Sequence, residues 1–358
     1  MEPEPRKLFQ KLQPYVPGEQ PQEGGFIKLN TNENPYPPGP SVVKRVSEAL
    51  RDRLRIYPDP VCLKLRNALS ERVGFPTEQI LVANGSDESL RLLCTAFLEP
   101  GEAIAMLSPT YSLYETLAQI ADATFVEFPV SAADDYAFPK GAIEEKQSKI
   151  FFLANPNPPL GTLYGRQTIR ALCEARADRL VVLDEAYVDF SRENHLSLVR
   201  DFPNLAVTRT YSKAYSLAGA RVGYAVAQPA LIERLNAIKD SYNVNALSQA
   251  AAIGALEDQS YYDQRIADLI ATRDILRGEL RALGFEVPES QGNFLFARCG
   301  DGAKMYEMLK EEKILVRYFL RANLKDGVRI TIGTKQQVAT LLETLKNLVE
   351  KVPALRQV

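Results

Sequence analysis

Two stretches decide the fold, RLVVLDEAYVDF (residues 179–190) and LAVTRTYSKAYSLAGARVGYAVA (residues 205–227). Each contains an apolar run with the length of one buried strand, and polar residues follow that run at once. Asp184 ends the first run, and Lys213 follows the second, with Arg221 eight positions further on. Ligand sites of open α/β sheets collect beyond the carboxyl ends of the strands. We therefore expect these side chains to converge on one site.

The same alternation of apolar runs with helical segments extends over the first two thirds of the chain. Amphipathic segments such as residues 88–98 and 165–177 lie between runs that read as buried strands. This pattern is typical of an α/β fold with a mostly parallel sheet that helices cover on both faces. The seven strand candidates are residues 79–85, 103–108, 123–130, 149–156, 179–186, 205–212 and 220–227.

The pattern changes after Gln228, where helical segments continue to about residue 283 without a strand candidate. The rest of the chain predicts a smaller α+β domain, with strands at residues 285–290, 293–299, 314–319 and 328–334 and helices at 302–313 and 335–351. We expect an N-terminal arm (1–30), a large cofactor-binding domain (31–250) and a small C-terminal domain (251–358). Ser41 is the expected N-cap of the first long helix.

The bulk composition excludes several classes of protein. The chain has 358 residues, enough for two packed lobes, and a net charge of -2 that is not gathered into blocks. It lacks the basic stripe of a nucleic-acid binder and an apolar run long enough to span a membrane. The N-terminus is not signal-like, and the four cysteines lie far apart in the sequence. We expect a cytoplasmic protein with reduced thiols, no metal site, and no nucleic-acid or membrane partner.

A single histidine, His195, limits the chemistry further. His-rich zinc sites are excluded, and a Ser-His-Asp hydrolase would need His195 as its base. Because His195 lies in the polar segment SRENHLS (191–197), we expect an exposed loop histidine. Acid–base chemistry must then come mainly from lysine, tyrosine or carboxylate side chains.

The polar residues at the strand ends specify a cofactor when they are taken together. Individually, each has an ordinary role as a helix cap or a loop residue. Together, a lysine amine can condense with an aldehyde, a buried carboxylate can pair with a protonated pyridine, and a helix N-terminus with an arginine can hold a phosphate. Pyridoxal 5'-phosphate requires these parts. The residues concerned are Lys213, Asp184, Tyr187, Arg221 and, at the start of a helix in NGSDESLRLL, Gly85, Ser86 and Asp87.

Six motifs resemble those of fold-type-I aminotransferases, and the likeness extends from KLNTNENPYPP (28–38) to the final helix. Within that family the chain is most similar to the histidinol-phosphate aminotransferases. The resemblance implies transamination between L-histidinol phosphate and 2-oxoglutarate, in a ping-pong reaction of histidine biosynthesis with glutamate as the other amino acid. The motifs are NGSDE (84–88), PTYSLYE (109–115), NPNPPLG (155–161), DEAYVDF (184–190), SKAYSLAGARVGY (212–224) and VRITIGT (328–334).

The resemblance also implies a role for each matching residue. Lys213 would form a Schiff base with the cofactor and then shuttle the proton of the reaction. Asp184 would hold the pyridinium, and Tyr187 the 3' oxygen of the ring. Tyr111 would stack on the ring. The phosphate segments contain Gly85, Ser86, Asp87, Ser212 and Arg221, while Tyr57 would reach the phosphate of a neighbouring subunit, which implies a homodimer.

Three residues would recognise the substrate. By resemblance, Arg329 binds the carboxylate of the amino-acid partner, Arg317 is associated with the phosphate of histidinol phosphate, and Tyr15 lies near the substrate. The alternative for Arg317 is that it merely lies on an edge strand.

One motif departs from the family pattern. Members usually have N-P-N-N-P-T-G here, and the second central asparagine touches the oxygen of the cofactor ring. This chain has proline at that position, Pro158. We expect Asn157, one residue earlier, to make the contact instead.

Other functions stay open at this point. A threonine-phosphate decarboxylase shares the lysine loop, and an aromatic aminotransferase shares the flat pocket, although DEAYVDF and VRITIGT favour histidinol-phosphate transamination. A non-catalytic cofactor-binding module, as in some transcription regulators, would need a DNA-binding domain for which residues before 30 leave no room. A nucleotide-binding domain would need a GxGxxG or P-loop pattern, and the sequence has neither.

Overall fold

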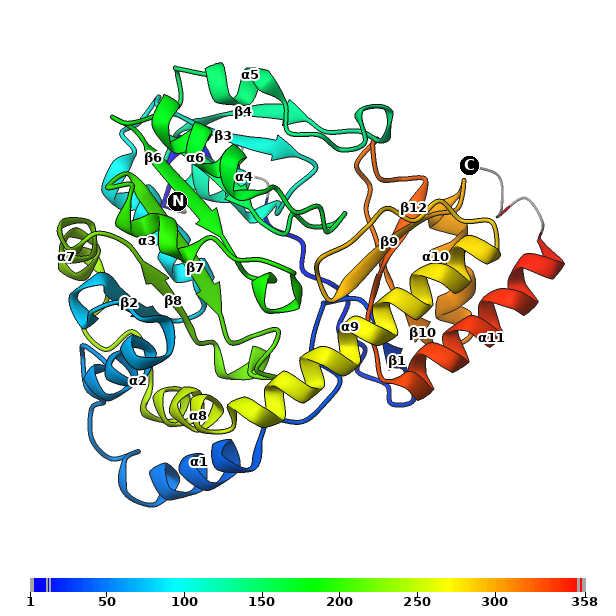
Figure 1. The fold of residues 1–358 in the computed structure, drawn as a ribbon, viewed down its shortest axis with the longest axis horizontal. Helices are drawn as coiled ribbons and strands as arrows, with labels where there is room; N and C mark the ends of the chain where they lie inside the picture. The colour runs from blue at the N-terminus through cyan, green and yellow to red at the C-terminus, as the bar shows by residue number, and fades with distance from the viewer. Residues whose placement is uncertain (1–2, 11, 13, 353–354, 356–358) are drawn as a thin grey trace.

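The computed structural model describes residues 3–10, 12, 14–352 and 355. The largest sheet in this part of the chain has seven strands (Figure 1). The strand order is β2-β8-β7-β6-β5-β3-β4, and β8 alone runs antiparallel to its neighbours. Each strand lies within one of the seven predicted runs, so the predicted mostly parallel α/β sheet is confirmed. The strands are β2 (Ile80–Ala83), β3 (Ala103–Ser108), β4 (Thr124–Pro129), β5 (Ile150–Ala154), β6 (Leu180–Asp184), β7 (Leu205–Thr210) and β8 (Gly223–Val226).

Helices cover both faces of this sheet, and the alternation of side chains along the strands decides which face each residue packs against. Phe152 and Val182 pack with residues of α3, α4 and α7, whereas Phe151 and Val181 pack with residues of α2, α6 and α8. Both faces of the central strands are therefore dry, which explains their uninterrupted apolar runs. The helices here are α1 (Pro40–Asp52), α2 (Leu63–Val73), α3 (Ser86–Phe97), α4 (Leu113–Ile120), α5 (Lys140–Glu144), α6 (Arg166–Ala175), α7 (Pro229–Ile238) and α8 (Ala246–Glu257).

The C-terminal third forms two smaller sheets packed beside long helices (Figure 1). One is a three-stranded antiparallel sheet of order β11-β12-β9, and the other pairs β1 near the N-terminus with β10 in parallel. The strands are β1 (Ile27–Lys28), β9 (Phe294–Arg298), β10 (Ile314–Leu315), β11 (Arg317–Tyr318) and β12 (Gly327–Thr331); the helices are α9 (Gln259–Ala282), α10 (Gly302–Glu311) and α11 (Lys335–Lys351).

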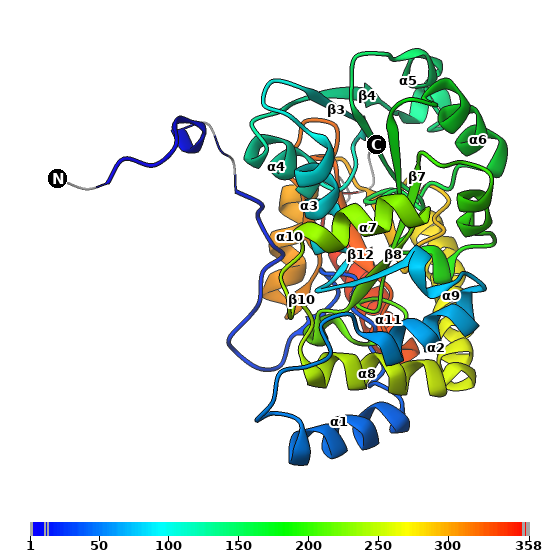
Figure 2. The ribbon, with the colours of Figure 1, turned by 90° about the vertical axis from the view of Figure 1, so that its left-hand side faces the viewer.

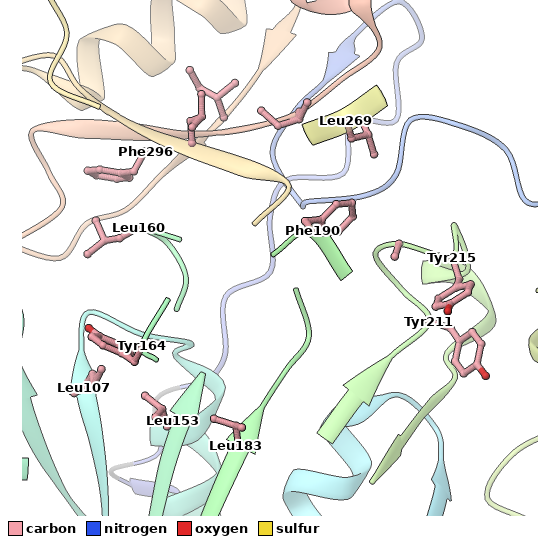
Figure 3. Close-up of a cluster of buried hydrophobic side chains, with 14 of the residues drawn as sticks. Leu107, Leu153, Leu160, Tyr164, Leu183, Phe190, Tyr211, Tyr215, Leu269 and Phe296 are labelled. Atoms are coloured by element: carbon pink, nitrogen blue, oxygen red, sulfur yellow. The ribbon is translucent and has the colours of Figure 1, made fainter. Parts of the chain in front are cut away.

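One cluster of buried side chains joins the two regions (Figure 3). It includes Leu153 and Leu183 of the large sheet and Leu160 in the following loop, and it continues to Leu269 of α9 and Phe296 of β9. This shared core holds the carboxyl ends of the parallel strands against the smaller sheets. The proposed division at residues 30 and 250 stays a prediction.

Two local predictions were wrong. Residues 285–290 do not form a strand, since Glu286 alone makes an isolated bridge, to Arg298. The first long helix begins at Pro40 with Gly39 as its N-cap, because proline is well suited to the first helical turn. Ser41 instead lies inside the helix, where its amide donates to Asp258 Oδ2 at 2.7 Å.

Residues 3–10 extend away from the sheets (Figure 2). They contain the short 3-10 helix η1 (Lys7–Gln10), and the chain returns at residues 14–19 to the edge of the main pocket. Within the described part of the chain, we find no helix long and apolar enough to cross a bilayer. The other 3-10 segments are η2 (Thr77–Gln79), η3 (Ala132–Asp134), η4 (Val188–Phe190), η5 (Leu196–Arg200) and η6 (Ala218–Ala220).

Candidate active site

A pocket of about 650 Å³ lies at the carboxyl ends of β3, β5, β6 and β7, where the smaller sheets meet the large one. The sheet places there residues that are far apart in the sequence, because the carboxyl ends of parallel strands share one edge. Eleven of the predicted site residues line this pocket: Tyr15, Ser86, Asp87, Tyr111, Asp184, Tyr187, Ser212, Lys213, Arg221, Arg317 and Arg329.

Lys213 lies in the loop that follows β7, and its amine enters the pocket. Its Nζ donates to the carbonyl oxygen of Thr31 at 3.0 Å and lies 5.9 Å from the centre of the Tyr187 ring. Burial, and next the positive charge of Arg329, lower the pKa of Lys213 to about 8. Near neutral pH an amine with this pKa is uncharged, and so nucleophilic, in a far larger fraction of molecules than a solvated lysine is.

Asp184 is the last residue of β6 and is 3% exposed. Its Oδ2 accepts a hydrogen bond from the hydroxyl of Tyr114 at 2.8 Å, and its Oδ1 accepts one from Thr208 at 3.2 Å. Burial raises the pKa of Asp184 to about 6, while these hydrogen bonds act in the opposite direction. A buried carboxylate of this kind favours a cationic partner, such as a protonated pyridine nitrogen.

The start of α3 forms a cradle with the loop after β7. Arg221 adopts the left-handed conformation, with φ of 53°, and its guanidinium donates to Ser212 Oγ at 3.3 Å and to Asp87 Oδ2 at 3.1 Å. A Cβ on Gly85 would come within 2.6 Å of that guanidinium, so the missing side chain makes room for it. The N-terminus of α3, Ser212 and Arg221 together present the donors that a phosphate group requires.

Three tyrosines form the aromatic wall of the pocket. Tyr187 accepts a hydrogen bond from the Asn32 side chain at 2.9 Å. Tyr111 donates its hydroxyl to Asp87 Oδ1 at 3.2 Å, and the ring of Tyr15 meets it edge-on with centroids 5.9 Å apart. Tyr111 and Tyr187 therefore line the space in which a flat ligand would lie between Asp184 and Lys213, and their predicted contacts with the cofactor ring stay predictions.

Two arginines carry positive charge into the opposite side of the pocket. Arg329 lies in β12 and donates to the carbonyl oxygen of Asn30 at 2.9 Å. Arg317 lies in β11 and donates to the carbonyl oxygens of Val16 and Pro17 at 2.8 and 2.9 Å. Neither guanidinium forms an ion pair with a carboxylate in the described residues. β11 is an edge strand, as the alternative interpretation of Arg317 required, yet the side chain still lines the pocket.

Three predicted site residues lie outside the pocket lining. Gly85 acts through the space that it leaves for Arg221. Asn157 is fully buried, with its amide donating to the carbonyl of Pro109 at 2.8 Å and its Oδ1 accepting from Thr110 at 2.6 Å. Pro158 and Pro159 occupy the pocket wall instead. Tyr57 is 78% exposed and stacks on Tyr242, so it does not reach the pocket of its own chain.

The expectation of an exposed histidine was wrong. His195 is 1% exposed, and its Nδ1 lies 3.8 Å from Glu185 Oε1 and 3.5 Å from the Asn155 amide. The polar segment around it folds inward because Glu185, the residue after β6, accepts a hydrogen bond from the His195 amide at 2.8 Å. His195 does not line the pocket. Burial lowers the pKa of His195, which favours a neutral structural ring.

Other residues that touch the site were missed from the sequence. Tyr114 lies three residues after Tyr111 in the quoted motif PTYSLYE, and that helical spacing could have placed both on one face. Asn32 and Arg321 gave no such signal, since their partners Tyr187 and Glu115 are far away in the sequence.

The residues fit the cofactor that the motifs imply. Pyridoxal phosphate requires an amine, a carboxylate for its ring nitrogen, a flat aromatic wall and a cradle for its phosphate, and the structure brings all four into one pocket. The close approach of Arg221 over Gly85 argues most directly for the phosphate, because a residue with a side chain at position 85 would obstruct it.

Comparison with known proteins gives the same family. Residues 25–345 match the family Aminotransferase class I and II. The histidinol-phosphate aminotransferase of Microcystis aeruginosa is 42% identical over 96% of this chain and 98% of its own length, and that of Syntrophotalea carbinolica is 44% identical over 96% and 99%. The crystal structure of the histidinol-phosphate aminotransferase from Sinorhizobium meliloti, in complex with pyridoxal-5'-phosphate, covers 96% of this chain and 97% of that chain with a TM-score of 0.86 and 26% identity.

Aspartate aminotransferase from Thermus thermophilus, solved with maleate, has a TM-score of 0.83 at 20% identity and shows the likeness of the fold alone. The full-length relatives, the family match and the convergence of Lys213, Asp184 and Arg329 in one pocket agree. The chain therefore belongs to the class I and II aminotransferases and, within them, to the histidinol-phosphate aminotransferase family.

Proposed function

We propose that the protein transfers an amino group between L-histidinol phosphate and 2-oxoglutarate, with pyridoxal phosphate as its cofactor. The observation that carries the proposal is the meeting in one pocket of a nucleophilic lysine, Lys213, with two arginines, Arg317 and Arg329, that have no carboxylate partner in the part of the chain that the structure describes. Relatives that span the whole chain at 42–44% identity carry the name of this enzyme.

The chain's own residues would hold the cofactor at both ends. Pyridoxal phosphate, when bound, supplies an electron sink for negative charge on the substrate α-carbon. Asp184 would pair with the ring nitrogen and Tyr187 with the ring oxygen, while Tyr111 covers one face. The phosphate would meet Ser86, Ser212, Arg221 and the amides of Gly85 and Asp87. Asn157 would need to leave its bonds to Pro109 and Thr110 to touch the ring, so this contact stays a prediction.

Lys213 would serve as the acid–base group of the reaction. Its Nζ has a lowered pKa, so it can accept a proton from the substrate α-carbon and return it one step later. The carbonyl oxygen of Thr31 accepts a hydrogen bond from this amine and so fixes its direction. The aromatic wall around it excludes water from the transferred proton.

Arg329 and Arg317 would select anionic substrates. Both guanidinium groups contact neutral carbonyls and aromatic rings, so their positive charge stays available to a ligand, and a carboxylate or phosphate can bind them in a bidentate geometry. Histidinol phosphate and 2-oxoglutarate both carry such groups. Tyr15, edge-on to Tyr111, would close the pocket over the substrate.

A half-reaction tests this proposal. Purified protein loaded with pyridoxal phosphate is mixed with histidinol phosphate alone, without a keto acid, and the visible absorption and the release of the keto product are followed. The expected result is one equivalent of product per site, with phenylalanine reacting far more weakly. Equal reaction with phenylalanine would indicate a broader aromatic aminotransferase. Release of carbon dioxide from threonine phosphate instead would indicate a decarboxylase.

We further propose that the protein is a homodimer in which Tyr57 reaches the cofactor phosphate of the partner subunit. Large apolar side chains are exposed along α1 and the segment that follows it, which is unusual for a surface facing water. Tyr57 lies in this surface and stacks on Tyr242 with ring centroids 4.5 Å apart. The exposed side chains are Val43, Leu50, Leu54, Ile56, Tyr57, Val61, Leu63 and Tyr242.

Hybrid dimers test the shared site. Chains with Lys213→Ala and chains with Tyr57→Ala are each expected to be impaired, and subunit exchange should create one site with both native residues. Activity that rises on mixing supports the shared site, and mixing without recovery, although exchange is verified by mass, contradicts it.

The four cysteines are free and buried, which supports a reducing compartment, and we propose the cytoplasm.

A further inference from the structure

Tyr114 lies behind the pocket lining and contacts Asp184, and the proposed function gives it no role. It lies near the start of α4, and none of its side chain is exposed to water. Its hydroxyl donates to Asp184 Oδ2 at 2.8 Å. A buried tyrosine needs a partner for its hydroxyl, and here that partner is the carboxylate proposed to hold the ring nitrogen of the cofactor.

The ring of Tyr114 is held on both sides. It stacks on Phe152 of β5 with centroids 4.8 Å apart and planes at 14°, and it meets Tyr111 edge-on at 5.6 Å. The hydroxyl therefore has one direction available to it. Because Tyr111 belongs to the pocket wall, Tyr114 contacts the two residues placed against the edge and the face of the cofactor.

The surroundings of Asp184 show why a donor is needed there. Opposite Tyr114, Thr208 of β7 pairs with Asp184 in register and donates to Oδ1 at 3.2 Å. Asp87 of α3 adds negative charge, and Tyr111 and Tyr187, which line the pocket, lie close enough for the charge of Asp184 to act on them. Burial and Asp87 favour the protonated acid, so Tyr114 and Thr208 are the side chains that favour the carboxylate.

We propose that Tyr114 is a positioning residue whose hydroxyl keeps Asp184 ionised and directed at the pyridine nitrogen of the cofactor. The inference rests on the proposed function, since it requires a cofactor that pairs with Asp184. Without this hydroxyl, Thr208 is the one side-chain donor left to Asp184 among the described residues, beside the backbone amide of Ala186, so Asp184 takes up a proton at a higher pH. A protonated Asp184 cannot stabilise a pyridinium, so cofactor binding should weaken most on the acid side.

The test compares Tyr114→Phe with a matched control, Tyr164→Phe. Tyr164 is also buried, and its hydroxyl donates to the carbonyl of Tyr136 at 3.2 Å, outside the pocket lining. Both changes remove one oxygen and keep the ring. The dissociation constant of pyridoxal phosphate is measured by fluorescence titration from acid to alkaline pH. Titration of the free cofactor is common to all the proteins, so it cancels in the comparison.

The expected result follows from the loss of one hydrogen bond to a charged group. Affinity for the cofactor should fall roughly tenfold to a hundredfold in Tyr114→Phe, and its acid inflection should move up by about one pH unit. Tyr164→Phe should overlay the wild-type curve. Incorporation of 3,5-difluorotyrosine at position 114, a more acidic donor that keeps the native contacts, should move the inflection to lower pH.

Three results would overturn the inference. They are an affinity curve of Tyr114→Phe that equals the wild-type curve, a loss of affinity that is the same at every pH, and an acid inflection that does not move when 3,5-difluorotyrosine replaces Tyr114. The fluorinated protein keeps the test valid if Tyr114→Phe does not fold. Failure of the proposed function is distinguishable. A wrong substrate would show in the half-reaction and leave the cofactor titration unchanged, whereas a wrong cofactor would show as a wild-type protein that does not bind pyridoxal phosphate.

Discussion

The amine of Lys213 should react with pyridoxal phosphate over a pH range that a solvated lysine cannot match. The perturbation is pH, applied to protein freed of cofactor. Burial in the pocket and the nearby charge of Arg329 both penalise the ammonium form, and the pKa of Lys213 falls from 10.5 to about 8. Only the uncharged amine attacks an aldehyde.

The size of the effect follows from these two values. At pH 7.5 an amine of pKa 10.5 is uncharged in about one molecule in a thousand, whereas an amine of pKa 8 is uncharged in about one in four. The rate of covalent loading should therefore rise with pH and level off above about pH 8. At neutral pH it should exceed the rate of a solvated lysine by about two orders of magnitude from this cause alone.

Stopped-flow absorbance measures this rate, and borohydride reduction followed by peptide mass analysis confirms that position 213 is the one modified. Nα-acetyl-lysine in the same buffers corrects for the ionisation of the cofactor. A corrected rate that keeps rising towards pH 10.5 would refute the reasoning, because it would mean that the pocket does not lower the pKa of this amine. Replacement of Arg329 by glutamine should move the plateau to higher pH.

Three further predictions concern recognition and stability. Arg329→Gln should raise KM for both substrates by roughly tenfold to a hundredfold in steady-state assays. Arg317→Gln should raise KM for histidinol phosphate more than KM for 2-oxoglutarate. Equal KM values for wild type and Arg329→Gln would contradict the proposed role. Arg176→Met removes the guanidinium that lies 2.6 Å from the buried carboxylate of Glu145 and leaves that carboxylate with the more distant Arg179 at 3.9 Å. It should cost about 3–5 kcal/mol in urea unfolding, whereas Arg170→Met at the exposed pair with Asp201 should cost less than about 1 kcal/mol. Burial lowers the pKa of His195 in the folded protein, so the unfolded chain takes up the proton first and stability should decline as the pH falls below 6.5. The urea midpoint of His195→Gln should lose this part of its dependence on pH. If the variant and the wild type have the same pH profile, His195 does not contribute to the acid dependence.

Local pattern was sufficient to predict the fold and the cofactor-binding residues at the strand ends, and the family resemblance supplied the other predicted pocket residues. Six of the seven apolar runs became strands whose residues are mostly buried, because a strand buried on both faces needs a continuous apolar sequence, while the seventh, β4, lies at the exposed edge of the sheet. Lys213, Asp184 and Arg221 were identified because strand-end positions carry polar residues that the sheet edge must bring together, whereas Arg329 was identified only through the family resemblance. The same logic failed for residues 285–290, where a short apolar segment has no neighbouring strand to pair with except at Glu286.

Contacts between distant segments decided the rest. His195 reads as a surface residue by its neighbours, yet Glu185 and Asn155 enclose it, and neither interaction leaves a trace in local composition. Tyr114 stands in a motif that was quoted for its neighbour, and only the packing of its ring on Phe152 of β5 directs its hydroxyl to Asp184. Asn157 matched a functional motif, but packing committed its amide to Pro109. Sequence thus determined which elements form and which chemical groups stand at their ends. Tertiary structure determined which of those groups meet, because burial and hydrogen bonding depend on neighbours that the chain brings from far away.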